Sequence, residues 1–307
     1  MKHRLVIKDI INHCYQRSAD GGLLFYSYSD YLVYFTLFCT CARKYNIKAI
    51  SLCQMPDHIH AALTARSAKD LTSFFQELNS RFAKEYNSAF KLKGKVFEAT
   101  FNSVPKKGPK AARNNIIYIG NNPVERQLVT RAEEYRWNYL AYSNSSHPFS
   151  EKYVTKLSSR EMRRVMKLVE SQHSAGRPLN YQMLRNISSK LSLVQKQQLI
   201  DRIITCYNVI DYDLAAKFFN SADEMIASMH YNTGNEYDLN EVFVGRDDKH
   251  YAQMTSVLMK QCGFNDIHEF LCMDTEGKME LFRILRRETY AMAAQICKYL
   301  HMNMSNV

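Results

Sequence analysis

Segments with the pattern of β-strands occur only in the first third of this 307-residue chain. They are short apolar or alternating runs, and segments with helical periodicity separate them. The strand-like segments are residues 10–16, 48–53, 58–63 and 95–104. The helical segments between and after them are residues 29–45, 69–89 and 110–121, the last ending before Pro123. Strands separated by helices predict an α+β fold, with a sheet and helices packed on one face.

The pattern changes after residue 142, where helical periodicity continues with few strand signals. Residues 143–148, Ser-Asn-Ser-Ser-His-Pro, have the composition of a linker. We therefore expect two domains, residues 1–145 and an all-helical domain of residues 146–307, which fits the usual size of about 150 residues per domain. The expected helices are residues 160–171, 191–207 and 222–230, and two within 279–300. A helical domain that closes its own core is the simpler interpretation, and a helix-turn-helix at its end is the alternative.

The positive charge of the chain is concentrated in its first half. The net charge is +11, yet residues 1–150 hold 21 Lys and Arg against 11 Asp and Glu, and residues 151–307 hold 20 against 19. Much of the excess comes from Arg81, Lys84, Lys91, Lys93, Lys95, Lys106, Lys107, Lys110 and Arg113. This pattern predicts a polyanionic partner. A basic surface kept for solubility is the alternative, and a membrane surface is disfavoured because the stretch is not one amphipathic helix.

Two histidines, His58 and His60, lie within one predicted strand. Residues i and i+2 of a strand point to the same face, so two imidazoles can bind one divalent metal and leave coordination positions open for substrate. Histidines that only pack in a core or on a surface are the alternative, and the pair alone does not decide between them.

A second chemical motif comes about sixty residues later, in residues 118–124 with the sequence Tyr-Ile-Gly-Asn-Asn-Pro-Val. On a helix, Tyr118 and Asn122 are separated by four residues and share a face. The phenol can serve as a nucleophile and the amide oxygen as a third metal ligand. A tyrosine that packs its ring, followed by an Asn-Pro helix end, explains the spacing equally well.

These motifs together resemble the REP-associated tyrosine transposases, a group of single-tyrosine HUH transposases. Residues 55–60, Met-Pro-Asp-His-Ile-His, are similar to the family motif Met-Pro-Asn-His-Val-His. Residues 118–124 are similar to Tyr-Ile-x-x-Asn-Pro-Val, and residues 135–137 repeat its Tyr-Arg-Trp motif with the only Trp of the chain. Further similarity lies in residues 13–17, which include Arg17, and in residues 81–87. The resemblance covers roughly residues 8–145.

The chain departs from the family pattern at several positions around these motifs. Asp57 replaces an Asn. In residues 94–101, Phe97 and Thr100 replace the Trp and the Arg of a Gly-x-x-Trp-x-Gly-Arg-Phe stretch. Residues 125–127 are Glu-Arg-Gln where the family has Arg-Ala-Gly. None of these changes falls on the histidine, tyrosine or Asn122 positions, so they bear on the DNA sequence rather than on the chemistry.

The resemblance implies an antiparallel sheet and a metal-dependent mechanism. His58, His60 and Asn122 would bind Mg²⁺ or Mn²⁺, and Tyr118 would attack the phosphorus of single-stranded DNA carrying short hairpins. The product would be a 5′-phosphotyrosine and a free 3′-OH. Arg17 and the nine basic residues between 81 and 113 would contact the DNA, although about half of those lysines would be merely solvated. The enzyme would act as a monomer or a homodimer.

Several alternatives remain at this point. Tyr86 also matches a family position and is the rival nucleophile, but no amide follows it four residues later. His13 is expected to be structural or to face substrate, and Asp57 to cap a turn. A nucleic-acid-binding regulator that no longer cuts and a water-using phosphodiesterase are the rival functions. The eight cysteines include no Cys-x-x-Cys pair and a chain this long needs no disulfides, which predicts reduced thiols and a cytoplasmic protein. With a DNA partner, we expect it to be nucleoid-associated.

Overall fold

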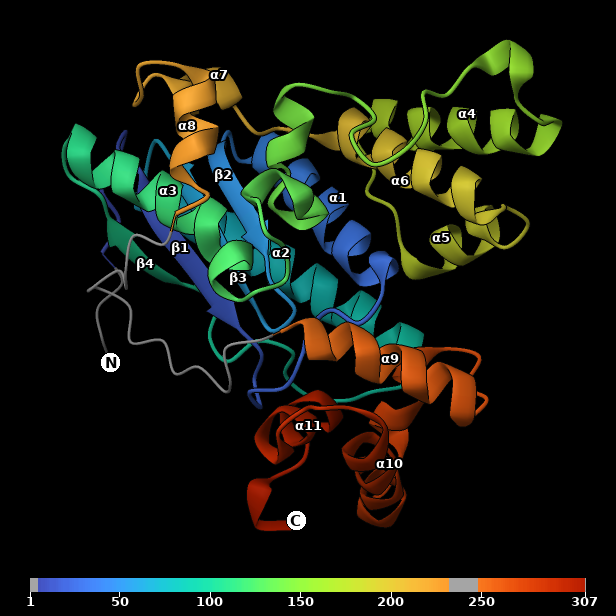
Figure 1. Cartoon of the computed structure of the whole chain (residues 1–307). Coiled ribbons are helices and arrows are strands. Elements are labelled where there is room, and N and C mark those ends of the chain that lie inside the picture. The colour runs from blue at the N-terminus through green and yellow to red at the C-terminus, as the bar shows by residue number, and fades with distance from the viewer. Residues whose placement is uncertain (1–4, 232–247, 307) are drawn as a thin grey trace.

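A four-stranded antiparallel sheet forms the centre of the first half of the chain (Figure 1). The computed structural model describes residues 5–231 and 248–306. The strands are β1 (Asn12–Arg17), β2 (Lys48–Gln54), β3 (His58–Thr64) and β4 (Asn102–Pro105), in the order β2-β3-β1-β4. The predicted α+β fold with an antiparallel sheet is thus confirmed. The fourth strand is shorter than predicted, and of the residues before it Phe97 forms only an isolated bridge with Ser18.

Helices cover both faces of this sheet. Helices α1 (Tyr28–Lys44) and α2 (Ala68–Phe90) lie behind it in Figure 1, and α3 (Pro109–Glu125) crosses in front. Since successive strand residues point to opposite faces, Ile59, Ala61 and Leu63 of β3 share a hydrophobic cluster with α1 and α2, whereas Ala62 packs with α3. The expected one-sided packing describes α1 and α2, and α3 adds a layer on the other face.

Helix α3 continues past the position where the sequence predicts its end. We expected Pro123 to stop the helix near residue 121, but the helix runs to Glu125. Pro123 has no N–H to donate and its ring crowds the carbonyl four residues earlier, but near the end of a helix this local loss does not prevent a final turn. The amide of Arg126 donates to the Asn122 carbonyl and closes that turn. The prediction was therefore short by one turn.

The described residues after 142 contain helices and no strand, as expected. The sequence pattern missed α5, α7 and α9. The helices are α4 (Arg160–Ser174), α5 (Tyr181–Ser188), α6 (Leu193–Tyr207), α7 (Tyr212–Ala216), α8 (Ala222–Ser228), α9 (Lys249–Gln261), α10 (Thr275–Glu288) and α11 (Ala293–Leu300). A 3-10 helix, η5 (Ile267–Cys272), joins α9 to α10.

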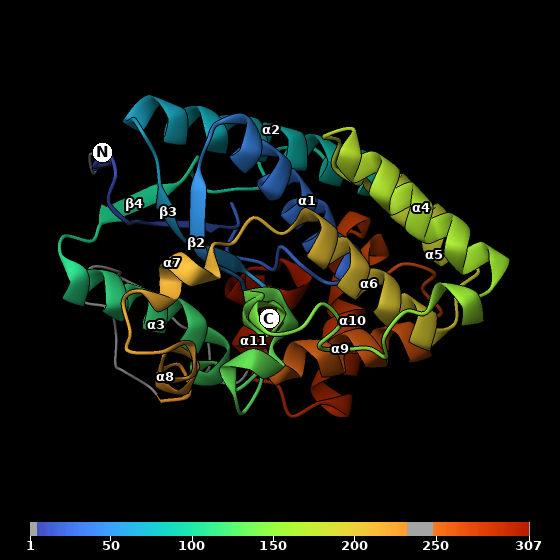
Figure 2. The same cartoon turned by 90° about the horizontal axis from the view of Figure 1, so that it is seen from above.

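These helices pack on the first half of the chain in three places. Figure 2 shows α5 and α6 beside α1, with α4 packed on α6, and α7 and α8 beside β2 and α3. Helices α9, α10 and α11 gather below the sheet in Figure 1, where their core includes Leu23 of the segment before α1. One hydrophobic cluster runs from Cys14 to Tyr207 and so crosses the predicted boundary at residue 145. That boundary stays a prediction. None of the described helices is long and apolar enough to cross a membrane.

Candidate active site

Strand register places the histidines on the sheet face that α3 covers. His60 pairs with Tyr15 of β1, and His58 pairs with Arg17. Paired residues of antiparallel strands point to the same face, so Tyr15 and Arg17 lie beside the two histidines. His13 precedes Tyr15 by two residues on β1, so it lies on the same face.

Tyr118 of α3 lies against two of these imidazole rings. Its ring centroid is 5.5 Å from that of His60 and 5.7 Å from that of His13, both in edge-on geometry. His13 Nε2 is 3.0 Å from His60 Nδ1, within hydrogen-bond distance. The Tyr118 side chain is buried, with 6% of the residue exposed. The structure therefore brings the predicted nucleophile next to the predicted histidine pair.

Asn122 lies one turn after Tyr118 and approaches the other histidine. Its Nδ2 donates to the Tyr118 carbonyl oxygen at 3.2 Å, which fixes the orientation of the amide. The Oδ1 atom then points to His58 Nε2 at a distance of 3.5 Å. The spacing of four residues on α3 thus carries both groups to the same two histidines.

Asp57 orients His58 from the loop between β2 and β3. Its Oδ1 lies 2.6 Å from His58 Nδ1, and its Oδ2 accepts a hydrogen bond from Lys298 Nζ of α11. Burial alone would raise the pKa of the Asp57 carboxyl, but the charges of His58 and Lys298 outweigh burial and hold it well below its usual value. Asp57 therefore links Lys298 of α11 to the candidate metal ligand His58, an ionic chain of three residues, instead of only capping a turn.

The donor set fits a divalent cation. Both histidines use Nδ1 for a partner, Asp57 for His58 and His13 for His60, so Nε2 is the nitrogen that would bind a metal. Ligands at about 2.1 Å and at right angles lie about 3 Å apart, which is close to the 3.5 Å between His58 Nε2 and Asn122 Oδ1. Among the described residues no group of three His, Cys, Asp or Glu side chains could bind a metal ion. The amide of Asn122 is thus the third donor that this site offers.

The C-terminal helices also hold α3 at its end. Arg126 forms a bidentate salt bridge with Asp248, at 2.7 and 3.0 Å, and both side chains are almost fully buried. Asn121 donates to the Met229 carbonyl just after α8. A Cβ atom on Gly120 would lie 2.2 Å from the Met229 sulfur, so any larger residue would require the Met229 side chain to move. The helix that carries Tyr118 is therefore clamped from outside the motif region.

The rival nucleophile Tyr86 lies elsewhere in the molecule. It belongs to α2, in the cluster on the opposite sheet face, and its ring contacts Phe82 and Phe90. Burial raises the pKa of its phenol well above the ordinary value. Tyr86 thus has the surroundings of a core residue.

The predicted DNA-contacting residues are spread over several elements. Lys106 is buried beside β4, Arg81 pairs with Glu77, and Arg113 pairs with Glu224 of α8. Arg17 is half-buried beside His58. The remaining six are exposed along α2, the loop after it and the start of α3: Lys84, Lys91, Lys93, Lys95, Lys107 and Lys110.

Sequence reasoning missed two members of the site, Tyr15 and Lys298, and left the role of His13 open. We expected His13 to be structural or to face substrate, and the structure adds its contact with His60. Tyr15 has its ring centroid 6.3 Å from that of His60. Alternation along β1 could have identified His13 and Tyr15, since both share a face. No local signal could have paired Lys298 with Asp57, which is 241 residues away.

Comparisons with known proteins locate the similarity in this part of the chain. Residues 27–105 match the family model described as "Transposase IS200 like". No curated protein matches the chain. One solved structure, described as a REP-associated tyrosine transposase bound to a REP hairpin, shares 16% identity over 52% of this chain and 93% of its own, with a TM-score of 0.41.

The family match spans α1 to β4, about a quarter of the chain. It includes His58 and His60 and ends before Tyr118, so the tyrosine rests on its motif and on the geometry described above. The resemblance to single-tyrosine transposases is confirmed by this match, and residues 27–105 are the segment through which the chain is similar to the IS200-like transposases.

Proposed function

We propose that this protein is a metal-dependent transposase that cuts and rejoins single-stranded DNA through Tyr118. The observation that carries the proposal is one constellation: the Tyr118 ring lies against His13 and His60, and the Asn122 oxygen lies against His58. Histidines with only a structural role would not require the amide of Asn122 and the phenol of Tyr118 to lie beside them on the same face of α3. The family match over residues 27–105 supports the same reaction class.

The reaction exchanges one phosphoester for another. The Tyr118 oxygen attacks the phosphorus, the bond to the 3′ oxygen breaks, and that oxygen leaves with a proton as a 3′-OH. The 5′ phosphate stays on the tyrosine, and the reverse attack by a 3′-OH rejoins a strand. The Tyr118 proton must leave as the bond forms, because a phenol with a pKa near 10 is a weak nucleophile at neutral pH.

The residues around Tyr118 have separate tasks. His58, His60 and Asn122 would bind Mg²⁺ or Mn²⁺, which when bound polarises the phosphate and stabilises charge on its oxygens. Asp57 and His13 hold the two imidazoles through Nδ1. Arg17, placed by register beside His58, would contact a phosphate oxygen. The substrate we propose is a strand with short hairpins, in line with the motifs of the chain.

A covalent-adduct assay tests the proposal. Labelled single strands with imperfect palindromes from the DNA around the gene are incubated with protein and Mn²⁺, then separated on a denaturing gel. We expect a protein–DNA band that is lost in EDTA and in Tyr118→Phe but kept in the matched variant Tyr86→Phe. Cleavage without a band, surviving Tyr118→Phe, would indicate hydrolysis instead. Tight binding with no cleavage of several hairpins would favour a regulator.

A further inference from the structure

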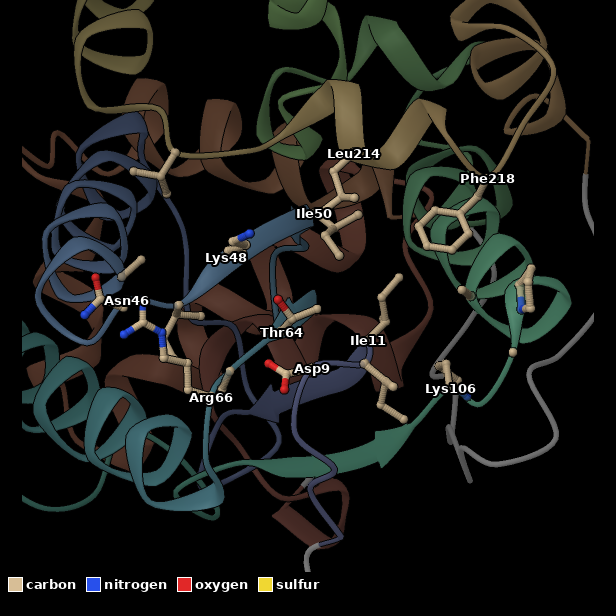
Figure 3. A pocket seen from close by; sticks show the side chains of 18 of the residues that line it. Asp9, Ile11, Asn46, Lys48, Ile50, Thr64, Arg66, Lys106, Leu214 and Phe218 are labelled. Carbon is tan, nitrogen blue, oxygen red and sulfur yellow. The ribbon is translucent and has the colours of Figure 1, made fainter.

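A cavity of about 900 Å³ opens at the end of the sheet that lies away from Asp57 (Figure 3). Its lining residues come from the segment just before β1, the start of β2, the end of β3 and the end of α1. The start of α3, α7 and Phe218 just after α7 complete the lining of the cavity. Its volume is in the range of sites that bind small organic molecules, about 300–1,000 Å³. None of the residues assigned to the reaction above lines it.

The walls of this cavity are largely apolar. Ile50 comes from β2 and Ile11 from the residue before β1, and Leu214 of α7 and Phe218 just after α7 face them (Figure 3). Leu214 and Phe218 are only half-buried, so part of their apolar surface remains accessible. A flat aromatic or aliphatic wall of this kind can stack against a planar ring.

The rim of the cavity is positive. Arg43, Lys48 and Arg66 contribute three exposed cations and the buried Lys106 a fourth, and Asp9 is the only carboxylate among the described residues that line the cavity. Arg43 is held by a hydrogen bond to the Tyr207 carbonyl at 2.7 Å. The start of α3 adds to this field, since Gly108 offers no side-chain cap and no acidic residue stands in the first turn. An apolar wall with a basic rim is complementary to a base with its flanking phosphates.

The cavity continues the sheet face of the candidate active site. Ile11 lies just before β1 and two residues before His13, and Thr64 follows His60 by four residues on β3. At about 3.3 Å per residue these separations are about 7 and 13 Å along the strands. A strand of DNA can therefore reach both places, because its phosphates repeat every ~3.4 Å or more.

We propose that this cavity holds one unstacked nucleotide of the single-stranded DNA substrate. The base would pack against Phe218 and Leu214, and Lys48 and Arg66 would contact the adjoining phosphates. The inference rests on the proposed function in one respect, that the chain binds single-stranded DNA. We favour a nucleotide within a strand over a free mononucleotide because the cavity and the histidines lie along the same face of the sheet. Only a strand would contact both places at once.

Photocrosslinking and binding test this site without requiring cleavage. The probe is an oligothymidylate carrying 5-bromodeoxyuridine, bound in EDTA to the full chain, irradiated, digested and examined by mass spectrometry. The double variant Lys48→Glu/Arg66→Glu reverses two exposed cations at the rim. The matched control Lys167→Glu/Lys190→Glu makes the same charge change on exposed residues outside the cavity.

We expect crosslinks on the peptide that contains Phe218. Affinity falls with salt, and each single-strand phosphate contact adds about 0.7 to the magnitude of the slope of log affinity against log salt. We therefore expect the rim variant, which loses two contacts, to reduce that magnitude by about 1.4. The control should keep the wild-type slope. Crosslinks confined to other peptides, or equal slopes for the rim variant and the wild type, would overturn the proposal. Displacement of the probe by thymidine monophosphate at the same concentration as the probe would also overturn the proposal. It would indicate that the cavity binds a free nucleotide instead.

The two proposals fail separately. A Tyr118 adduct with no crosslink at the cavity would leave the transposase function and remove the nucleotide site. Crosslinks at the cavity with no adduct would do the reverse.

Discussion

The two faces of the sheet, built from the same strands, carry different side chains. The face toward α1 and α2 is filled with packed rings, such as Phe75 stacked on Phe101 with centroids 4.4 Å apart. Among the buried polar residues of this face, Gln16 bonds to Tyr34, Asn79 and the Thr100 carbonyl, so its amide is satisfied within the core. The face toward α3 instead carries His13, His58 and His60 at its centre, with Tyr15 beside them.

The difference indicates that the α1 and α2 face serves the stability of the fold, whereas the α3 face would serve the proposed reaction. Side chains of a strand alternate, so residues 58–64 give the histidines to one face and Ile59, Ala61 and Leu63 to the other. Polar groups buried on the α3 face lower stability unless they are bonded, and the apolar face can offset that cost. We therefore expect substitutions on the two faces to separate activity from stability.

The largest effect is expected from His60→Ala. It removes one candidate metal ligand and the partner of His13, so adduct formation should fall at least about 10³-fold in single-turnover measurements. The free energy of unfolding, measured with denaturant, should change far less than that loss implies. A variant that unfolds easily but retains its adduct rate per folded molecule would show that the face is structural.

The converse substitution is Phe75→Ala on the opposite face. Phe75 is 2% exposed, and its truncation should cost about 3–5 kcal/mol of unfolding free energy through lost burial and a cavity. Adduct formation per folded molecule should stay at the wild-type rate. A large loss of rate in the folded fraction would break the separation between the faces.

The stability of the contact between α1 and the C-terminal helices should depend on pH through His268. Burial alone would lower the pKa of His268, but Asp30 and Asp266 outweigh it and raise the pKa to about 9. The unfolded value is near 6.5, so this stabilisation, up to about 3 kcal/mol, is complete below pH 6.5 and is lost as the pH rises through about 9.

Unfolding by denaturant across pH 6–10 measures this effect. The control is His268→Gln, which should remove the part of the pH dependence that His268 contributes. An unchanged pH dependence in His268→Gln would contradict the assignment.

The smallest effect concerns the ionic chain from α11 to the histidine face. Lys298→Met leaves the buried carboxylate of Asp57 without its cation, so His58 should lose its fixed orientation, with a loss of about 10-fold in adduct rate. Asp57→Asn, the residue of the family motif, needs no cation. The double variant Asp57→Asn/Lys298→Met should therefore recover most of the rate that Lys298→Met loses. Additive losses would show that the two residues act independently.

Much of the first half of the fold follows from local sequence patterns. Strand alternation and helical periodicity predicted β2, β3, α1 and α2 to within a few residues, because each of them buries a regular apolar face. The candidate site was predicted in part for the same reason, since His58 and His60, and Tyr118 and Asn122, each share a face through spacing alone.

The rest depends on contacts that no local pattern contains. Helices α5 and α7 span eight and five residues, too short for a clear period. The partners of Asp57 and Arg126 are Lys298 and Asp248, in a region with no motif of its own. Both Asp57 and Arg126 stand where the chain departs from the motifs of the transposases it resembles, and each is matched by an opposite charge near or on a C-terminal helix.

The most direct test of the central claim is to identify the residue that carries the DNA. The adduct formed with a labelled hairpin strand and Mn²⁺ is digested with protease and nuclease, and the nucleotide-bearing peptide is sequenced by mass spectrometry. The structure predicts a phosphotyrosine linkage at Tyr118, against the His13 and His60 rings. A linkage at Tyr86 or Tyr15, or strand cleavage that leaves no nucleotide on any peptide, would contradict it.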